Sequence, residues 1–403
     1  MSIDSRWTRL RRFISQRPGW LRWGAKRSDP ASLAETALPE PAETPALEPA
    51  TLEAPPRPPP TPPPPPPTQV APHRQPLPRL EIVIPRAPGR FETDTELGIH
   101  ASPFNAQHKR RAFIVYRPAG WSRELRAPLI VLCHGCKQTP EDFAKGTRID
   151  ELADRLGCLV LLPRQTKWAN PWLCWNWFDP SMTAGGGEAE IVAAQIRFVR
   201  QRYRTDPRRV MAVGISAGAA LAAALGLRYP RHVHAVVAHA GIAFGAARSA
   251  LGARDVMSRG PQADVAAIGV QARAKFGGVL PVPLLAIHGE SDTVVAPTNS
   301  IALVRQYLHF NAHPAVDETD RSGKLPRADA SATLVTADGR EMTTREWRLE
   351  GRLVARHVSV AGLGHAWSGG DASLAFNDRR APDSSKLVGD FLSEVLSGNP
   401  TIA

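Results

Sequence analysis

The chain has 403 residues, of which 39 are proline and four are cysteine, and its formal net charge is +12 at pH 7. Four cysteines in this length do not make a disulfide-dense scaffold, and no segment has the apolar length that a membrane span needs. Length and composition therefore predict one folded domain with a long appendage.

The appendage begins with a basic arm, residues 1–30. Its first 28 residues contain eight Lys and Arg and a single acid, Asp4, so they carry +7 of the net charge. Apolar residues recur there at helical spacing, as in a basic amphipathic helix that binds an anionic or apolar surface: Ile3, Trp7, Leu10 and Ile14. A disordered solubilising tail is equally favoured. Nucleic acid is not expected as a partner, because no base-reading module accompanies the charge.

Residues 31–92 form a proline-rich linker. Eighteen of the 39 prolines lie between Pro39 and Pro78. Such a stretch lacks backbone donors and apolar side chains, so we expect it to be extended and disordered. The arginines of the arm are not followed by the apolar core of a signal peptide, which favours a cytoplasmic or granule-associated protein; a transit peptide is the alternative.

Residues 93–403 are predicted to form an α/β domain with a mostly parallel central sheet and helices on both faces. Buried apolar runs indicate strands, and 3.6-residue periodicity indicates helices. The expected strands are 111–117, 128–133, 158–162, 210–213, 233–239, 284–288 and 357–360. The expected helices are 149–156, 188–202, 219–227 and 385–396.

The sequence from Gly214 to Gly218 is Gly-Ile-Ser-Ala-Gly, and it stands between an expected strand and an expected helix. A G-x-S-x-G motif in that context is typical of a sharp turn that exposes a nucleophilic serine. The alternative is an ordinary glycine-rich connection. The flanking elements favour Ser216 as a nucleophile.

Two further positions complete a predicted catalytic triad. Asp292 follows the expected strand 284–288, where a carboxylate orients a histidine, and it is favoured over the neighbouring Glu290. His365 follows the last expected strand within Gly-Leu-Gly-His-Ala-Trp, where it can act as general base. The order serine, aspartate, histidine is that of an α/β-hydrolase.

The segment that follows strand 128–133 is predicted to stabilise a developing oxyanion. The backbone N–H groups of Cys136 and Ala217 are its expected donors, whereas His134 is interpreted as a residue that stiffens the loop. Tryptophans near these loops suit an apolar or aromatic ligand, and Trp175, Trp177 and Trp367 are the predicted substrate-binding residues. Packing of a long loop onto the sheet is an equally favoured role for some of the tryptophans.

Five motifs in order resemble the polyhydroxybutyrate depolymerase family of esterases: H-G-C-x-Q, C-W-N-W-F, G-x-S-A-G, H-G-x-x-D and G-L-G-H-A-W-S-G-G. The resemblance covers about residues 104–396. It implies an α/β-hydrolase fold with the triad Ser216, Asp292 and His365. It also implies a disulfide between Cys136 and Cys174, although a cytoplasmic protein would keep both thiols reduced.

The resemblance implies a serine hydrolase of poly- or oligo-3-hydroxybutyrate or similar short-chain esters, without a metal or organic cofactor. An esterase of the feruloyl or acetyl-xylan type is the alternative, and a non-catalytic granule- or surface-binding protein is the least favoured. The family has secreted members, which usually carry a signal peptide, so the resemblance favours an extracellular location. The arm, in contrast, favours a cytoplasmic or granule-associated one. Ester substrates, and a polyester granule or anionic surface bound by the arm, are the expected partners.

Overall fold

The computed structural model describes residues 89–97, 111–277, 280–317, 320 and 322–397. The predicted arm and nearly all of the predicted linker lie outside the described residues. Within the described part of the chain, no helix is long and apolar enough to cross a membrane.

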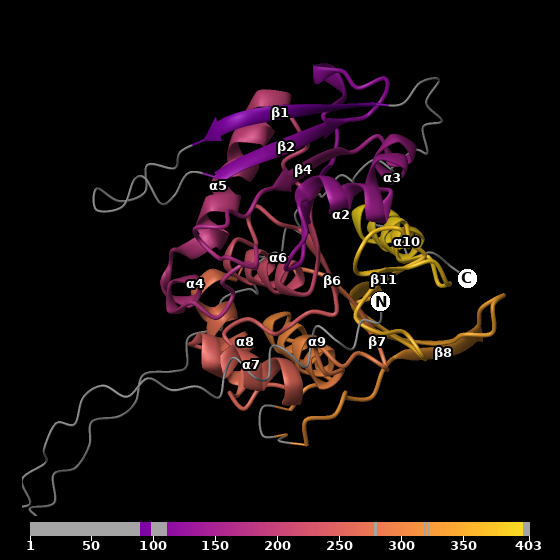
Figure 1. The fold of residues 1–403 in the computed structure, drawn as a ribbon. Coiled ribbons are helices and arrows are strands. Elements are labelled where there is room, and N and C mark those ends of the chain that lie inside the picture. Colours follow the sequence, from indigo (N-terminus) through magenta and orange to yellow (C-terminus); the bar gives the residue numbers. More distant parts are fainter. Residues whose placement is uncertain (1–88, 98–110, 278–279, 318–319, 321, 398–403) are drawn as a thin grey trace, which may run out of the picture. The chain divides into compact units, whose positions relative to one another are not determined.

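A ten-stranded sheet in the order β1-β2-β4-β3-β5-β6-β7-β10-β9-β8 organises the described residues (Figure 1). The strands from β4 to β10 in this order are parallel to one another, and antiparallel pairs flank them at both edges. The strands are β1 (Arg90–Leu97), β2 (Arg111–Arg117), β3 (Leu129–Cys133), β4 (Leu159–Pro163), β5 (Val210–Ile215), β6 (Ala235–His239), β7 (Leu284–Gly289), β8 (Ala330–Val335), β9 (Glu341–Leu349) and β10 (Arg352–Val360). A small pair, β11 (Trp367–Ser368) and β12 (Asn377–Asp378), follows them.

Helices cover both faces of the sheet (Figure 1). The helices are α2 (Pro140–Thr147), α3 (Ile149–Leu156), α4 (Pro180–Ala184), α5 (Gly187–Tyr203), α6 (Ala217–Arg228), α7 (Ala250–Arg259), α8 (Val265–Phe276), α9 (Thr298–Phe310) and α10 (Ser384–Ser397), with a short 3-10 helix at Arg123–Leu125. Buried side chains of α5 to α9 pack on one face, and those of α2, α3 and α10 pack on the other.

Strand β3 shows why the sequences of the central strands are continuous apolar runs. All five of its residues are buried, with Leu129 and Val131 in the core on the α5–α9 face and Ile130 and Leu132 in the core on the opposite face. A strand covered on both faces needs apolar residues at every position. The predicted strands and helices are all present, and the predicted fold class is confirmed.

The sequence interpretation missed β1, β8, β9, α2, α4, α9 and the short strands β11 and β12. The β8–β9 hairpin has exposed and half-buried residues, so an apolar run does not mark it. In α9, the polar residues Asn299, Arg305 and Gln306 are buried among apolar ones, which obscures the helical stripe.

Candidate active site

Ser216 stands between the end of β5 and the first residue of α6, with φ 57° and ψ −124°. A non-glycine residue pays a conformational cost for a positive φ, and such strain concentrates at functional positions. The serine backbone N–H donates to the carbonyl oxygen of His239, at the end of β6, over 2.9 Å. Ser216 therefore lies at the edge of the sheet where the parallel strands have their carboxyl ends.

The two glycines of the motif allow the chain to turn this sharply. A Cβ atom at Gly214 would lie 2.3 Å from the carbonyl oxygen of Gly218. A Cβ atom at Gly218 would lie 2.1 Å from the carbonyl oxygen of Cys133, at the end of β3. Larger residues would push the start of α6 away from β3, and with it the serine away from the loop after β3.

Asp292 and His365 are hydrogen-bonded to each other, with 2.7 Å between His365 Nδ1 and Asp292 Oδ2. Asp292 follows β7 and His365 follows β10, the next strand in the sheet. The other carboxylate oxygen of Asp292 accepts from the backbone N–H groups of Val294 and Val295, at 2.8 and 2.9 Å. The carboxylate is thus held in one orientation toward the imidazole.

The environment of Asp292 keeps its carboxyl group ionised. Burial acts to raise its pKa, but hydrogen bonding to His288 and His365 outweighs burial, and the pKa of Asp292 falls below its usual value. His288 Nε2 lies 3.5 Å from Asp292 Oδ2 and 2.9 Å from the carbonyl oxygen of Val295. An ionised carboxylate only accepts hydrogen bonds, so His365 donates from Nδ1 and its Nε2 is left to accept a proton.

Glu290, the less favoured alternative to Asp292, is exposed and accepts a hydrogen bond from Ser359. It forms no described contact with His365. The structure thus brings Asp292, and not Glu290, together with the predicted histidine.

The remaining histidines at this edge are buried and structural in character. His239 stacks on Trp367 with 5.1 Å between ring centroids. Burial, and then the charges of His288 and His365, lower the pKa of His239 to about 3. His357 accepts or donates one hydrogen bond, at 3.0 Å to Ser300, and burial lowers its pKa to about 3. Both imidazoles stay neutral at ordinary pH.

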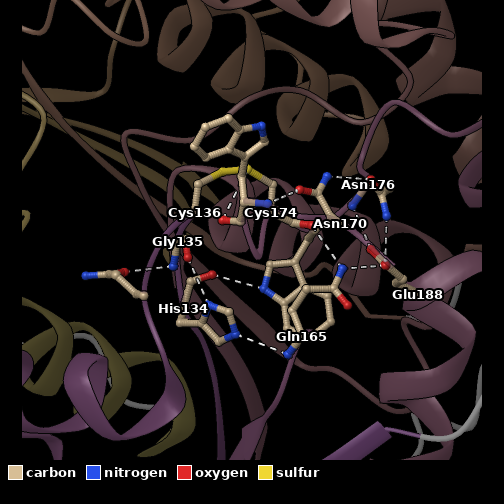
Figure 2. Close-up of a disulfide and its surroundings, with 11 residues drawn as sticks. His134, Gly135, Cys136, Gln165, Asn170, Cys174, Asn176 and Glu188 are labelled. Atoms are coloured by element: carbon tan, nitrogen blue, oxygen red, sulfur yellow. Dashed lines mark hydrogen bonds between the residues drawn. A yellow bond between two sulfur atoms is a disulfide. The ribbon is translucent and has the colours of Figure 1, made fainter. Parts of the chain in front are cut away.

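The loop after β3 is held by a dense set of hydrogen bonds (Figure 2). The N–H of Gly135 donates to the side chain of Gln138 over 2.8 Å, and the N–H of Lys137 donates to the carbonyl oxygen of Trp172 over 2.7 Å. The N–H groups of Cys136 and Ala217 have no acceptor in the described part of the chain. Both N–H groups are therefore open to another acceptor.

His134 has the stiffening role that the sequence indicates. It is fully buried, and its ring contacts the carbonyl oxygen of Gly135 at 2.9 Å and the N–H of Gln165 at 3.2 Å. Burial is the main reason that its pKa is lowered to about 4. A neutral ring with both nitrogens engaged is not available as a general base.

A disulfide joins Cys136 to Cys174, with 4.2 Å between their Cα atoms (Figure 2). It is the pairing that the family resemblance implies, and it ties the loop after β3 to the loop that contains the Trp-Asn-Trp-Phe sequence. Cys133 and Cys158 are free and buried. Burial raises the pKa of the Cys158 thiol to about 12, so it packs as a small apolar group.

Glu188, at the start of α5, anchors this second loop (Figure 2). Its carboxylate accepts from Gln165 Nε2 and from both the backbone N–H and the side chain of Asn176, at 2.5, 2.6 and 3.0 Å. Gln165 also donates to the carbonyl oxygen of Cys174 over 2.9 Å. The sequence interpretation gave no role to Glu188, Gln165 or Gln138; only Gln138 had a signal, as the last residue of H-G-C-x-Q.

The three predicted substrate-binding tryptophans are buried, which corrects the sequence interpretation. Trp175 is 0% exposed, Trp367 1% and Trp177 7%. The indole N–H of Trp175 donates to the carbonyl oxygen of His134, and that of Trp367 donates to Ser385. Their apolar area is used to pack the loops onto the sheet.

Trp168 and Trp172 are the exposed tryptophans of this loop, at 57% and 59%. The ammonium group of Lys137 lies 5.3 Å from the ring centroid of Trp172. Residue type alone does not tell the buried tryptophans of this loop from the exposed ones. The two exposed tryptophans differ only in that they precede the Cys-Trp-Asn-Trp-Phe motif.

Comparison with known proteins identifies the family. Residues 111–328 match the family model described as esterase PHB depolymerase. Poly(3-hydroxyalkanoate) depolymerase C of Paucimonas lemoignei is 32% identical over 204 residues, which are 50% of this chain and 49% of that protein. Feruloyl esterase B of Neurospora crassa is 29% identical over 188 residues, which are 44% of this chain and 63% of that protein.

The chain thus matches about half to just under two thirds of the length of these relatives. Among solved structures, an acetyl xylan esterase from Aspergillus awamori has a TM-score of 0.56 at 18% identity, over 69% of this chain and 94% of that one. This likeness concerns the fold. The family model spans more than half of the chain and includes Ser216 and Asp292. The chain belongs to the esterase PHB depolymerase family.

Proposed function

We propose that the chain is a serine esterase that hydrolyses hydroxyalkanoate or similar short-chain carboxylic esters, with Ser216 as nucleophile, His365 as general base and Asp292 as the partner of His365. The observation that carries the proposal is the hydrogen bond between His365 Nδ1 and Asp292 Oδ2 at the sheet edge where Ser216 is held in a strained turn. Family membership supports the reaction class.

In the proposed reaction, His365 Nε2 takes the proton of the Ser216 hydroxyl as the serine oxygen attacks the ester carbonyl carbon. The imidazolium is stabilised by the Asp292 carboxylate and returns the proton to the leaving alcohol, which leaves an acyl-serine. Water then attacks the acyl-serine with the same help from His365, releasing the acid and restoring the serine.

The backbone N–H groups of Cys136 and Ala217 are the proposed donors to the oxyanion in both steps. Support comes from their place at the ends of two neighbouring strands and from the lack of another acceptor within the described residues. The disulfide at Cys136 and the hydrogen bonds around Glu188 would hold the first donor in place before substrate arrives.

For the substrate, Trp168 and Trp172 replace the three buried tryptophans as the proposed contacts. The carbonyl oxygen of Trp172 accepts from Lys137, the residue next to Cys136, so the loop that carries this exposed ring is bound to the loop of the proposed oxyanion donor. An aromatic face suits an apolar polyester segment, a feruloyl ring or a sugar. The names of the relatives leave carbohydrate esters as the second candidate.

A substrate panel tests the proposal. Hydrolysis of p-nitrophenyl butyrate should be lost in Ser216→Ala, and the ratio of activities on 3-hydroxybutyrate oligomers, methyl ferulate and acetylated xylan identifies the acyl group. Preference for the oligomers supports the hydroxyalkanoate assignment. Preference for methyl ferulate or acetylated xylan supports the second candidate, and activity that survives Ser216→Ala refutes both.

We also propose that the basic arm attaches the enzyme to a polyester granule or an anionic surface. The support is compositional: eight Lys and Arg among the first 28 residues, interleaved with tryptophans. Replacing Arg9, Arg11 and Arg12 with glutamine in the full chain should weaken sedimentation with granules and leave turnover of a soluble ester unchanged. Unchanged sedimentation would contradict the attachment.

A further inference from the structure

A pocket lies at the end of the sheet opposite to the end that carries Ser216. It has a volume of about 430 Å³, and its lining includes Arg126, Arg197, Arg200, Arg204, Thr205 and His232. Arg126 precedes β3, Arg204 and Thr205 lie between α5 and β5, and His232 precedes β6. These strands are parallel, so the pocket lies at their amino ends, whereas the proposed catalytic residues lie at the carboxyl ends.

The pocket is strongly basic. Four of its lining residues are arginines, and none of the lining residues is acidic. Within the described residues, no carboxylate forms an ion pair with any of the four guanidinium groups. The nearby Asp206 forms its ion pair with Arg209, at 3.4 Å, and lies outside the lining, although its charge also acts on Arg200. Four like charges around one hollow repel one another, and an anion would relieve that repulsion.

The favourable interaction of positive charge with the carboxyl end of a helix explains only some of the four arginines in this pocket. Arg200 and Arg204 lie at the carboxyl end of α5, where positive charge interacts favourably with the helix dipole. Arg126 belongs to a different segment, and Arg197 lies nearly two turns before the end of the helix. The dipole does not account for their convergence on the same hollow.

Thr205 supplies an independent observation. Its residue is 5% exposed and lines the pocket, yet its hydroxyl group has no hydrogen-bond partner among the described residues. A buried hydroxyl without a partner is destabilising. Rotation of the Thr205 side chain toward the pocket would let a ligand oxygen supply the missing partner.

We propose that this pocket binds the phosphoryl group of a phosphorylated ligand, either a soluble compound or an anionic lipid headgroup. Guanidinium groups donate paired hydrogen bonds that match phosphate oxygens, and a threonine hydroxyl adds one more donor. The volume lies in the range of pockets that hold small molecules. Several cations and no anion in the lining favour a ligand with more than one negative charge.

The state of His232 agrees with a positive field in the pocket. Burial, followed by the charges of Arg200 and Arg197, lowers the pKa of His232. The Arg200 guanidinium lies 3.2 Å from His232 Nδ1, so the neutral imidazole accepts from the arginine and orients it. The Arg200 guanidinium is thus held by a neighbouring side chain of the pocket.

The test uses the full chain and two probes. Inorganic pyrophosphate, titrated by calorimetry, represents a soluble ligand. Phosphatidylcholine vesicles with and without phosphatidylglycerol, in a sedimentation assay, represent the lipid headgroup. Arg200→Gln and Thr205→Val should each weaken binding of the relevant probe by roughly tenfold or more, because each removes a hydrogen bond to a charged group.

Arg254→Gln is the matched control, because it removes the same charge from an exposed position on α7. The basic arm is unchanged in every variant, so differences between variants report the pocket. Loss of pyrophosphate binding in Arg200→Gln and Thr205→Val, but not in Arg254→Gln, supports a soluble ligand. Loss of phosphatidylglycerol-dependent sedimentation in the same two variants supports a lipid headgroup.

Thr205→Val preserves the shape of the side chain and decides the test if Arg200→Gln does not fold, as judged by thermal melting. The proposal is overturned if the wild-type chain binds neither probe, or if Arg254→Gln weakens binding as much as the pocket variants do. Esterase activity is not the readout, so this result is independent of the proposed catalytic function.

Discussion

His365 Nδ1 and Asp292 Oδ2 lie 2.7 Å apart although 73 positions separate the two residues in the sequence. The contact forms because β7 and β10, the strands that precede the two residues, are parallel neighbours in the sheet. Parallel neighbours place the loops after their carboxyl ends side by side. The hydrogen bond fixes the tautomer of the imidazole.

Asp292→Asn should reduce kcat for p-nitrophenyl butyrate by about four orders of magnitude, as in the corresponding change of a serine protease triad. An asparagine amide can donate to Nδ1 and so favours the tautomer with the proton on Nε2, the atom that must act as base. Steady-state kinetics measures the loss. Glu290→Gln is the control, since Glu290 is exposed, and it should retain most of the activity.

Ser216→Ala should reduce hydrolysis by about 10³-fold or more, because the backbone donors remain but the nucleophile is gone. Its melting temperature should equal or exceed that of the wild-type chain, since the side chain makes no described hydrogen bond. Ser258→Ala, an exposed serine on α7, controls for the loss of a hydroxyl. A Ser216→Ala chain with a tenth of the wild-type rate would rule out the nucleophile assignment.

The stability of the domain should depend on pH through Asp292. Its pKa in the folded chain lies below the usual value, because hydrogen bonding to His288 and His365 outweighs burial. A group of this kind stabilises the fold above its unfolded pKa, about 3.9, and loses that contribution as the pH falls toward the folded value.

The difference in melting temperature between the wild-type chain and Asp292→Asn should therefore shrink as the pH falls below about 4. Thermal melts above and below this pH, in one buffer series at fixed ionic strength, measure the difference. A gap that stays constant to pH 3 would show that the carboxylate is not stabilised in the folded chain.

Reduction of the Cys136–Cys174 disulfide should lower both stability and turnover. The bridge closes a loop with a sequence separation of 38, which corresponds to roughly 3–4 kcal/mol on the chain-entropy model. Turnover should fall because Cys136 carries a proposed oxyanion donor. The experiment compares melting temperature and kcat with and without dithiothreitol.

A Cys136→Ser, Cys174→Ser double variant is the control for dithiothreitol, which should have no further effect on it. The buried thiols of Cys133 and Cys158 remain in this control. Alkylation of both Cys136 and Cys174 in the unreduced protein would contradict the bridge.

Trp175→Ala and Trp172→Ala should separate a packing role from a substrate role. Trp175 is fully buried and hydrogen-bonded to His134, so its truncation should cost about 3–5 kcal/mol of unfolding free energy in urea. Trp172 is 59% exposed, so its truncation should leave stability nearly unchanged and raise KM for aromatic or polymeric esters. Equal stability loss in both variants would contradict this division.

The sequence by itself determined the fold class and most of its elements. Continuous apolar runs such as 129–133 indicate strands that are buried on both faces, and helical periodicity between them indicates a parallel sheet. Gly214 also has a local cause, because a Cβ atom there would overlap the backbone of Gly218, four residues further along the chain. Local sterics and hydrophobic period are properties of a short segment, so they can be predicted without a structure.

Only the tertiary structure decided which residues meet. Asp292 and Glu290 are two positions apart, and their opposite environments arise from the strands packed beside them. Trp172 and Trp175 are equally apolar, yet one is exposed and the other is buried against His134. The arginine pocket joins residues from three connections at the amino ends of β3, β5 and β6. Burial and pairing depend on contacts between distant segments, and strand order in the sheet sets those contacts.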